Sequence, residues 1–210
     1  FDGSSNYVNF GSIGNCGIEC RVEMKFNTTD SGQIFFSQRD ATRSSVLYHA
    51  SLTSDLRFYN DNGNLRVWNG NITPIDIRDG DIHTMLFEKK GKDLSITIDG
   101  ETQSVTKVFE DSGDTGDFAV GGHPNEGTEF DGNIWDVKID AGNTGSWQNS
   151  YKGYGTTDSA WEDQIGNNDG TVVGSPTATS TVTSNSGTLT RRYESDTDVN
   201  TRDFTENNGI

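Results

Sequence analysis

The sequence predicts an all-β protein, built as a two-sheet antiparallel sandwich and followed by an extended C-terminal arm. From Ile18 to Phe26, apolar residues alternate with charged ones, so one face of this segment is apolar and the other is charged. That period of two is typical of a strand with one face in water. Roughly ten such short segments are separated by turn residues, which is typical of a sandwich or barrel. No longer window carries an apolar stripe at helical spacing, so the pattern excludes a mainly helical fold.

The predicted strands are separated by clusters of glycine, asparagine, aspartate and serine, the residues that favour turns. The turn-rich loop Asn60–Asn64 joins two of them as a hairpin, and Gly91 can adopt the positive φ that the next hairpin needs. In chain order, the predicted strands are Tyr7–Phe10, Ile18–Phe26, Gln33–Ser37, Val46–His49, Leu56–Tyr59, Leu65–Trp68, Ile82–Glu88, Leu94–Asp99, Thr102–Phe109, Phe118–Gly121 and Asn133–Ile139.

The composition changes twice toward the C-terminus. After Gly142 apolar residues become sparse and mostly aromatic, and after Pro176 the chain is rich in serine, threonine and asparagine. Such a polar segment buries too little surface to fold alone. We therefore predict a sandwich domain over residues 1–176 and an arm over residues 177–210 that becomes ordered against a partner.

The arm also contains residues of the types that anchor protein interfaces. Two arginines in a chain of net charge −16 can pair with acids on a neighbouring copy, and an extended segment can add a strand to a sheet edge. The predicted partner-binding residues are Arg191, Arg192, Tyr193 and Phe204.

The formal net charge of −16 argues against a nucleic-acid partner and against docking on an anionic membrane, since both need a basic face. No stretch approaches the ~18 apolar residues that span a bilayer, so membrane insertion is not expected. The chain begins at Phe1, and no targeting signal can be read from it. The acidity either keeps an exposed protein soluble or holds divalent cations.

Cys16 and Cys20 are expected to be free thiols, buried or half-buried. If both belonged to one strand they would lie roughly 13 Å apart at ~3.3 Å per residue, and a disulfide needs Cα atoms within about 7 Å. Free thiols suit synthesis in a reducing compartment.

Three stretches resemble the laminin-G-like branch of the concanavalin A-like lectin/glucanase superfamily. Phe1–Val8 resembles the opening FDGxxxYV strand, His83–Gly100 the central hairpin ending in an Asp-Gly turn, and Phe130–Ile139 the F-x-G-x-I-x-D-V-x-I strand. Trp161–Val173 resembles the W-x-D-x-G-N-x-x-D-G-T-V ending common in phage and bacterial surface proteins with this fold. The resemblance implies two sheets curved into a jelly roll. It does not imply one activity, because its members include lectins, adhesion modules, virion proteins and glycosidases.

The acidic residues do not form the pattern that glycosidase members of the superfamily need. Glu129 and Asp131 come nearest to a carboxylate pair, but no third acid follows at the required spacing. No Gly-x-Ser-x-Gly elbow and no His-x-x-x-His pair is present. His49 and His83 lie within strand patterns and are expected to be hydrogen-bonded structural residues. We expect no catalysis.

Two loops are the predicted ligand sites. Trp68 with Asn69 offers a stacking platform for a sugar ring, and a core or edge tryptophan next to a turn is the alternative. The loop after Phe118–Val120 carries His123, which can bond a sugar, and Asn125 and Glu126, which offer hard oxygen ligands. Asp40 can join the last two around calcium, although calcium takes ~6–8 oxygens and these loops supply few acids. Ordinary polar turns are the alternative for the loop that carries His123 and for the loop that carries Asp40.

Two non-catalytic functions therefore remain open. One is a non-catalytic structural module of a virion or cell surface, such as a capsid decoration or fibre protein, exposed and able to bind glycans. Its partners would be copies of itself or a viral shell or tail protein, reached through the arm. The other is a secreted carbohydrate-binding or adhesion lectin domain, and a glycoside hydrolase comes third. The expected location is the virion surface, with an extracellular or bacterial cell-surface location as the alternative.

Overall fold

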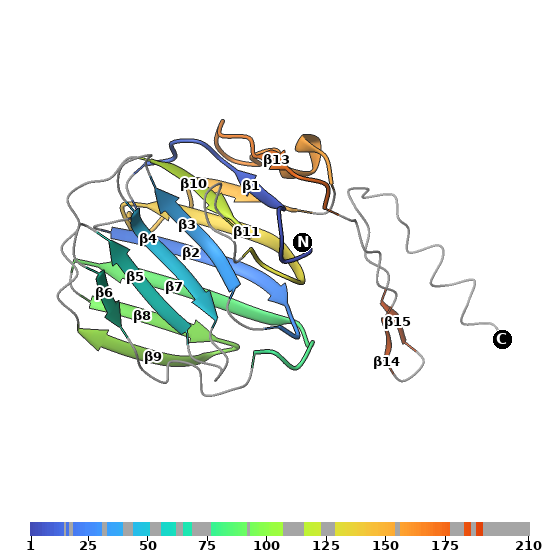
Figure 1. Ribbon diagram of the computed structural model, residues 1–210, viewed down its shortest axis with the longest axis horizontal. Coiled ribbons are helices and arrows are strands. Elements are labelled where there is room, and N and C mark those ends of the chain that lie inside the picture. The colour runs from blue at the N-terminus through green and yellow to red at the C-terminus, as the bar shows by residue number, and fades with distance from the viewer. Residues whose placement is uncertain are drawn as a thin grey trace. The chain divides into compact units, whose positions relative to one another are not determined.

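The computed structural model shows a two-sheet antiparallel sandwich, as predicted (Figure 1). It describes residues 1–14, 16, 19–30, 33–39, 44–50, 56–61, 65–68, 77–91, 93–106, 116–122, 129–153, 156–176, 183–185 and 188–190. For β4, β5 and β6 it describes the backbone and its pairing. The chain divides into two compact units, Phe1–Thr177 and Ala178–Ile210.

The first unit contains both large sheets. The seven-stranded sheet has the order β13-β1-β10-β3-β4-β5-β6 and the six-stranded sheet the order β12-β11-β2-β7-β8-β9, with antiparallel pairing throughout the described part. The seven-stranded sheet comprises β1 (Tyr7–Asn9), β3 (Gln33–Arg39), β4 (Ser44–Ala50), β5 (Leu56–Asp61), β6 (Leu65–Trp68), β10 (Asp117–Val120) and β13 (Thr171–Val173). The six-stranded sheet comprises β2 (Glu19–Asn27), β7 (His83–Lys90), β8 (Asp93–Ile98), β9 (Glu101–Thr106), β11 (Asn133–Ala141) and β12 (Asn149–Tyr151).

A short 3-10 helix, η1 (Asp158–Trp161), precedes β13. In the second unit, β14 (Thr183–Asn185) pairs with β15 (Thr188–Thr190) as a separate two-stranded sheet. Within the described residues, no helix is both long and apolar enough to cross a membrane.

The core lies between the two large sheets and is rich in aromatic rings. β2 supplies Val22, Met24 and Phe26 to it, all fully buried, while the charged residues between them face away. Phe26 meets Phe35 edge to face at 4.8 Å between ring centroids. Each fully buried side chain of this size contributes ~1.5–3 kcal/mol through the hydrophobic effect, so the alternation in β2 fixes which face of the strand is buried.

The prediction for the two cysteines is wrong, because Cys16 and Cys20 form a disulfide. Their Cα atoms lie 4.6 Å apart. β2 begins only at Glu19, and Cys16 lies in the turn before it. The spacing of an extended strand therefore does not apply between the two residues. The backbone N–H of Cys16 donates a hydrogen bond of 2.8 Å to Oε1 of Gln38 on β3, which ties this turn to the seven-stranded sheet.

Candidate functional site

Most of the predicted site residues lie in loops outside the described residues, so the structure does not test whether they form one site. Trp68 ends β6, where it pairs with Phe58, but its side chain is not among the described ones. The remaining residues predicted to bind a ligand, a metal or a partner lie wholly outside the described residues. They are Asp40, Asn69, His123, Asn125, Glu126, Arg191, Arg192, Tyr193 and Phe204.

Both ends of the loop that carries His123 are nevertheless described, and they are anchored to the sheet. The N–H of Gly121 donates to the carbonyl of Phe35 at 2.9 Å, and the N–H of Phe130 donates to the carbonyl of Gly121 at 2.8 Å. Gly121 has φ +81°, and a Cβ there would lie 2.3 Å from the ring of Phe1. Only glycine fits this position, so the base of the loop is held firmly against β3.

A buried carboxylate lies at this base. Glu129 is only 8% exposed, and its Oε2 is buried without a hydrogen-bond partner. Its side chain packs beside Gly122 and Tyr7. A Cβ built on Gly122 would come within 2.8 Å of Cγ of Glu129 and 3.1 Å of Cβ of Tyr7. Glycine at 122 therefore lets the carboxylate and the phenol side chain approach each other.

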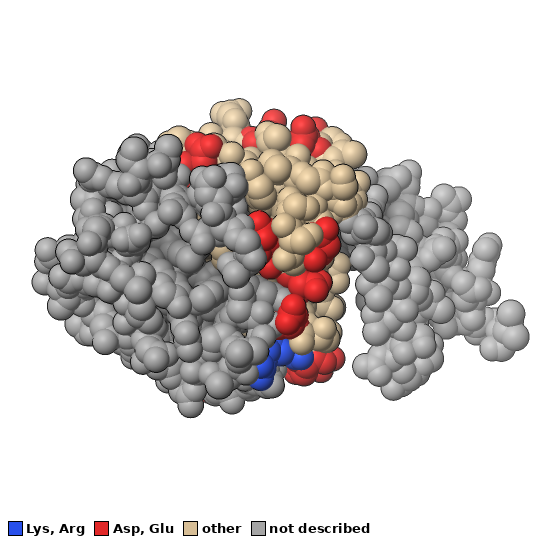
Figure 2. Space-filling model, in the orientation of Figure 1, with Lys and Arg blue, Asp and Glu red and all other residues tan. Residues whose placement is uncertain are grey.

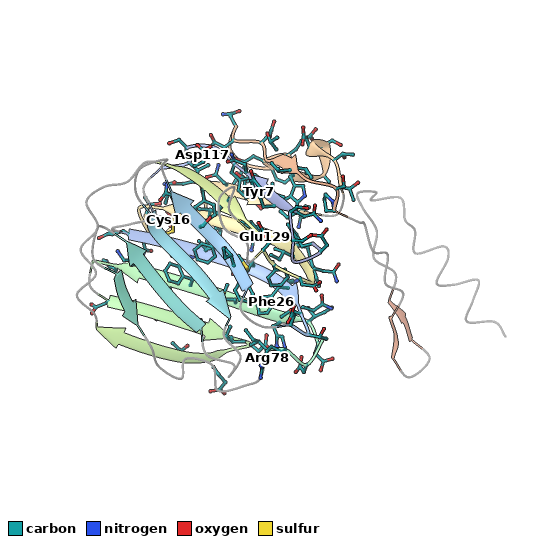
Figure 3. The ribbon with its side chains drawn as sticks, viewed as in Figure 1. Tyr7, Cys16, Phe26, Arg78, Asp117 and Glu129 are labelled. Carbon is teal, nitrogen blue, oxygen red and sulfur yellow. A yellow bond between two sulfur atoms is a disulfide. The ribbon has the colours of Figure 1, made fainter. Side chains whose placement is uncertain are left out.

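Tyr7 connects Glu129 to a second polar pair on the outer face of the seven-stranded sheet. Val8 of β1 pairs with Val120, and both point into the core, so Tyr7 and Asn9 face outward. The amide of Asn9 donates to Oδ2 of Asp117 at 3.0 Å. In Figure 3, the labelled Tyr7, Asp117 and Glu129 lie over the same end of the sandwich.

The electrostatics of this cluster keep the phenol protonated. Burial first, and then the negative charges of Asp117 and Glu129, raise the pKa of Tyr7 above its ordinary value. The phenol is therefore protonated at neutral pH and can donate a hydrogen bond, with the negative charges of Asp117 and Glu129 near it. Small buried residues occupy the next positions across the sheet, with Asn9 paired to Ala119 and Ala119 paired to Ser37. We call Tyr7, Asn9, Asp117 and Glu129 the outer-face cluster.

Glu129 and Asp131 do not face each other as a catalytic pair. Glu129 is buried against Gly122, whereas Asp131 is exposed and lies beside Gly3, 3.2 Å from the position of an added Cβ there. Asp131 also forms an isolated bridge with Asp2. Figure 2 shows Asp and Glu side chains at several places on the described part of the visible face and few Lys or Arg side chains. No group of three or more metal-ligating side chains occurs among the residues that the structure describes.

His83 is hydrogen-bonded within the fold, which confirms the structural role predicted for it. Its Nδ1 lies 2.7 Å from Oδ2 of Asp99 and its Nε2 lies 2.9 Å from Oδ1 of Asp79. The ring is buried and packs against Phe26 at 5.6 Å. Burial alone would lower the pKa of His83, but the two carboxylates outweigh it and raise the pKa above its ordinary value.

This arrangement predicts a pH-dependent stability. Because the folded pKa of His83 is raised, its contribution is complete below the ordinary histidine pKa of about 6.5 and is lost as the pH rises through the folded value. His83→Gln removes the ion pairs. We expect wild type to exceed this variant in unfolding free energy by about 1 kcal/mol near pH 6, a modest value because both carboxylates are partly exposed. Urea titrations at several pH values measure the difference, which should shrink as the pH rises through the folded pKa of His83. A difference that stays constant with pH would contradict the assignment.

Comparison with known proteins gives the fold. No family model matches the chain, and no curated protein matches it. Among solved structures, domains LG4-5 of the mouse laminin α1 chain are similar with TM-score 0.56 and 17% identity, over 71% of this chain and 42% of that one. A proposed carbohydrate binding protein from Bacteroides ovatus has TM-score 0.55 and 13% identity, over 84% of this chain and 60% of that one. The LG1-3 region of the laminin α2 chain has TM-score 0.50 and 15% identity, over 67% and 27%.

These similarities show the fold. The chain is an antiparallel jelly-roll sandwich, a fold that it shares with laminin G domains. It spans less than two thirds of the length of each of these neighbours. At such identities the comparison carries the fold and no particular activity.

The outer-face cluster was not predicted as a site. Glu129 was considered only as a catalytic acid, and Tyr7 only as part of the opening motif. The pairing of β1 with β10 joins residues more than a hundred positions apart in the chain, and no local pattern in the sequence reveals it.

Proposed function

We propose that this chain is a non-catalytic, lectin-like module that binds glycans on a virion or cell surface. The observation that carries the proposal is the fold, a lectin-type sandwich with structural likeness over most of its length to a proposed carbohydrate binding protein. The separate positions of Glu129 and Asp131 support the absence of glycosidase chemistry. A secreted adhesion lectin is the alternative.

The disulfide supports a location outside a reducing compartment. Disulfides persist on secreted proteins and on virion and cell surfaces, and Cys16–Cys20 ties a turn at the edge of the core. Among such locations we propose a virion surface, with an extracellular or bacterial cell surface as the alternative.

The virion role would run through the C-terminal arm. The division of the chain at Thr177 and the separate pairing of β14 with β15 support an arm that acts apart from the sandwich. Arg191, Arg192, Tyr193 and Phe204 would contact another copy or a shell or tail protein. A chain truncated after Pro176 should keep its melting temperature and lose its attachment. Normal assembly of the truncated chain would remove the arm from this role.

Glycan binding is tested with a printed oligosaccharide array, followed by calorimetry on the strongest hit. We expect binding to one group of related sugars and no release of reducing ends from it. An array without signal would refute the glycan proposal, and hydrolysis lost in Asp131→Asn would refute the non-catalytic one.

Calcium, which we propose is held by Asp40, Asn125 and Glu126, should raise the melting temperature by mass action. An unchanged melting temperature in millimolar calcium would exclude that site.

A further inference from the structure

The unpartnered oxygen of Glu129 differs from the other buried polar atoms that lack a hydrogen bond. Arg21 Nε lies 3.5 Å from a Glu88 carboxylate, and Asp136 Oδ1 lies 3.6 Å from the ammonium of Lys152. Asn6 lacks a partner only at its Nδ2, because its Oδ1 accepts from the N–H of Ser175 at 2.7 Å. Among the described residues, Oε2 of Glu129 has neither a hydrogen bond nor an opposite charge.

Such a group is expensive to bury. A buried acceptor left without a donor costs about 1–3 kcal/mol, and more when it is charged. Most buried polar atoms in folded proteins are satisfied, so an exception calls for a physical explanation. Anchoring of the loop base at Gly121 and Phe130 holds Glu129 in this position. The fold thus keeps an acceptor ready for a donor that the described chain does not supply.

We propose that Glu129 is the central acceptor of a subsite for a hydroxyl group of a neutral glycan, with Tyr7 beside it. This inference rests on the proposed glycan-binding function and assigns its site. A sugar hydroxyl donates one hydrogen bond and accepts others, which matches a carboxylate acceptor next to a protonated phenol donor. The aromatic ring of Tyr7 adds an apolar surface for the sugar ring.

The charges around Glu129 select the class of ligand. An anionic glycan would meet Glu129 and Asp117 together in a chain of net charge −16, so a sialylated or sulfated sugar is disfavoured. A divalent cation needs ~6–8 oxygen ligands, and the described part of the chain contains no cluster of three ligating side chains. A neutral sugar uses the donors and acceptors that are present.

The test compares Glu129→Gln with Asp131→Asn as a matched control. Asp131 is also a carboxylate and lies two residues away, but it is exposed beside Gly3. Calorimetry uses the neutral oligosaccharide that gives the strongest signal for wild type on the array. We expect Glu129→Gln to weaken binding roughly 10- to 100-fold, because it replaces a charged acceptor by an amide. Tyr7→Phe should weaken it several-fold, and Asp131→Asn should bind within about twofold of wild type.

Thermal unfolding without sugar separates a ligand subsite from a structural role. Because Oε2 of Glu129 has no hydrogen-bond partner among the described residues, Glu129→Gln should unfold at the same or a higher temperature than wild type. A lower melting temperature would show that Glu129 stabilises the fold and would overturn the subsite. Equal sugar affinities for wild type and Glu129→Gln would overturn the subsite and leave the glycan function standing. A wild type that binds no neutral sugar would overturn both proposals. If Glu129→Gln lost the rise in melting temperature that calcium causes but kept its sugar affinity, Glu129 would be a cation ligand and the sugar subsite would be overturned.

Discussion

Substituting Gly132 by alanine is expected to destabilise the sandwich by about 4 kcal/mol, one of the largest effects of any single change in the described core. Gly132 has φ +140°, a conformation that side chains rarely adopt, and this strain costs ~1–3 kcal/mol. The new Cβ would also lie 2.1 Å from the backbone oxygen of Asn27 and 2.9 Å from the ring of Phe130. Because one obstacle is backbone of the neighbouring strand β2, no rotamer change relieves the clash, and overpacking adds ~1–3 kcal/mol.

The matched control for this substitution is Gly11→Ala. Gly11 has φ +64°, but nothing lies within 4 Å of an added Cβ. It should therefore cost only the ~1–2 kcal/mol of a left-handed residue. Urea unfolding of both variants measures the difference. Equal losses for the two glycines would show that β11 and β2 can separate enough to admit a methyl group, and that the approach of these strands is not a strict requirement of the fold.

Gly132 also shows how far sequence reasoning reaches in this protein. The strand Asn133–Ile139 was correctly predicted, because alternation is a local signal, and β11 spans Asn133–Ala141. The reason for that glycine is the carbonyl of Asn27, which lies more than a hundred positions earlier and touches it only in the folded sheet. Local patterns therefore predict the element, whereas tertiary packing decides which residue the element can tolerate.

The same division explains the strands that were predicted and those that were missed. Alternation located β2 within one residue of its observed start, since an apolar face repeated over nine residues is a strong signal. The three-residue strands β12 and β13 have no room for a period, and each pairs at the margin of a sheet. Cys16 was misjudged because the spacing argument assumed that the strand began before it.

The candidate site was only partly accessible to sequence reasoning. The loop after β10 was predicted as a ligand site, and the structure places a buried acid, Glu129, at its base. The sequence contains no signal that this acid lacks a hydrogen-bond partner, because that depends on which residues the fold packs around it. Tyr7 joins Glu129 only through the position of β1 beside β10.

Trp161 connects the C-terminal part of the sandwich to its N-terminal strand. Its ring lies 6.4 Å from the ring of Phe1 and 6.0 Å from that of Phe10, and a Cβ on Gly153 would come within 2.6 Å of it. The carbonyl of Trp161 accepts from the N–H of Gly170 at 2.9 Å. The segment after Gly142, in which the sequence shows few apolar residues other than aromatic ones, thus contributes Trp161 to the core.

Trp161 also positions the edge of the seven-stranded sheet. It ends η1, and Asp158 at the start of η1 accepts a hydrogen bond of 2.7 Å from the N–H of Val172 in β13. β13 in turn pairs with β1, where Val173 lies opposite Tyr7. Loss of the indole should therefore loosen the edge strand that lies against the outer-face cluster.

Trp161→Ala is accordingly expected to reduce the free energy of unfolding by about 4 kcal/mol, because it leaves a large cavity under η1. Ile165→Ala is the control, since Ile165 is 56% exposed in the loop that follows η1 and should change stability by less than ~0.5 kcal/mol. Urea unfolding measures both variants, and amide hydrogen exchange should show faster exchange at Val172 in Trp161→Ala, because the Asp158 bond opens with η1. If Trp161→Ala costs less than about 1 kcal/mol, the segment from Gly142 to Pro176 is an appendage on the sandwich. If the cost is near 4 kcal/mol, that segment belongs to its core, and any glycan subsite built on Tyr7 depends on it.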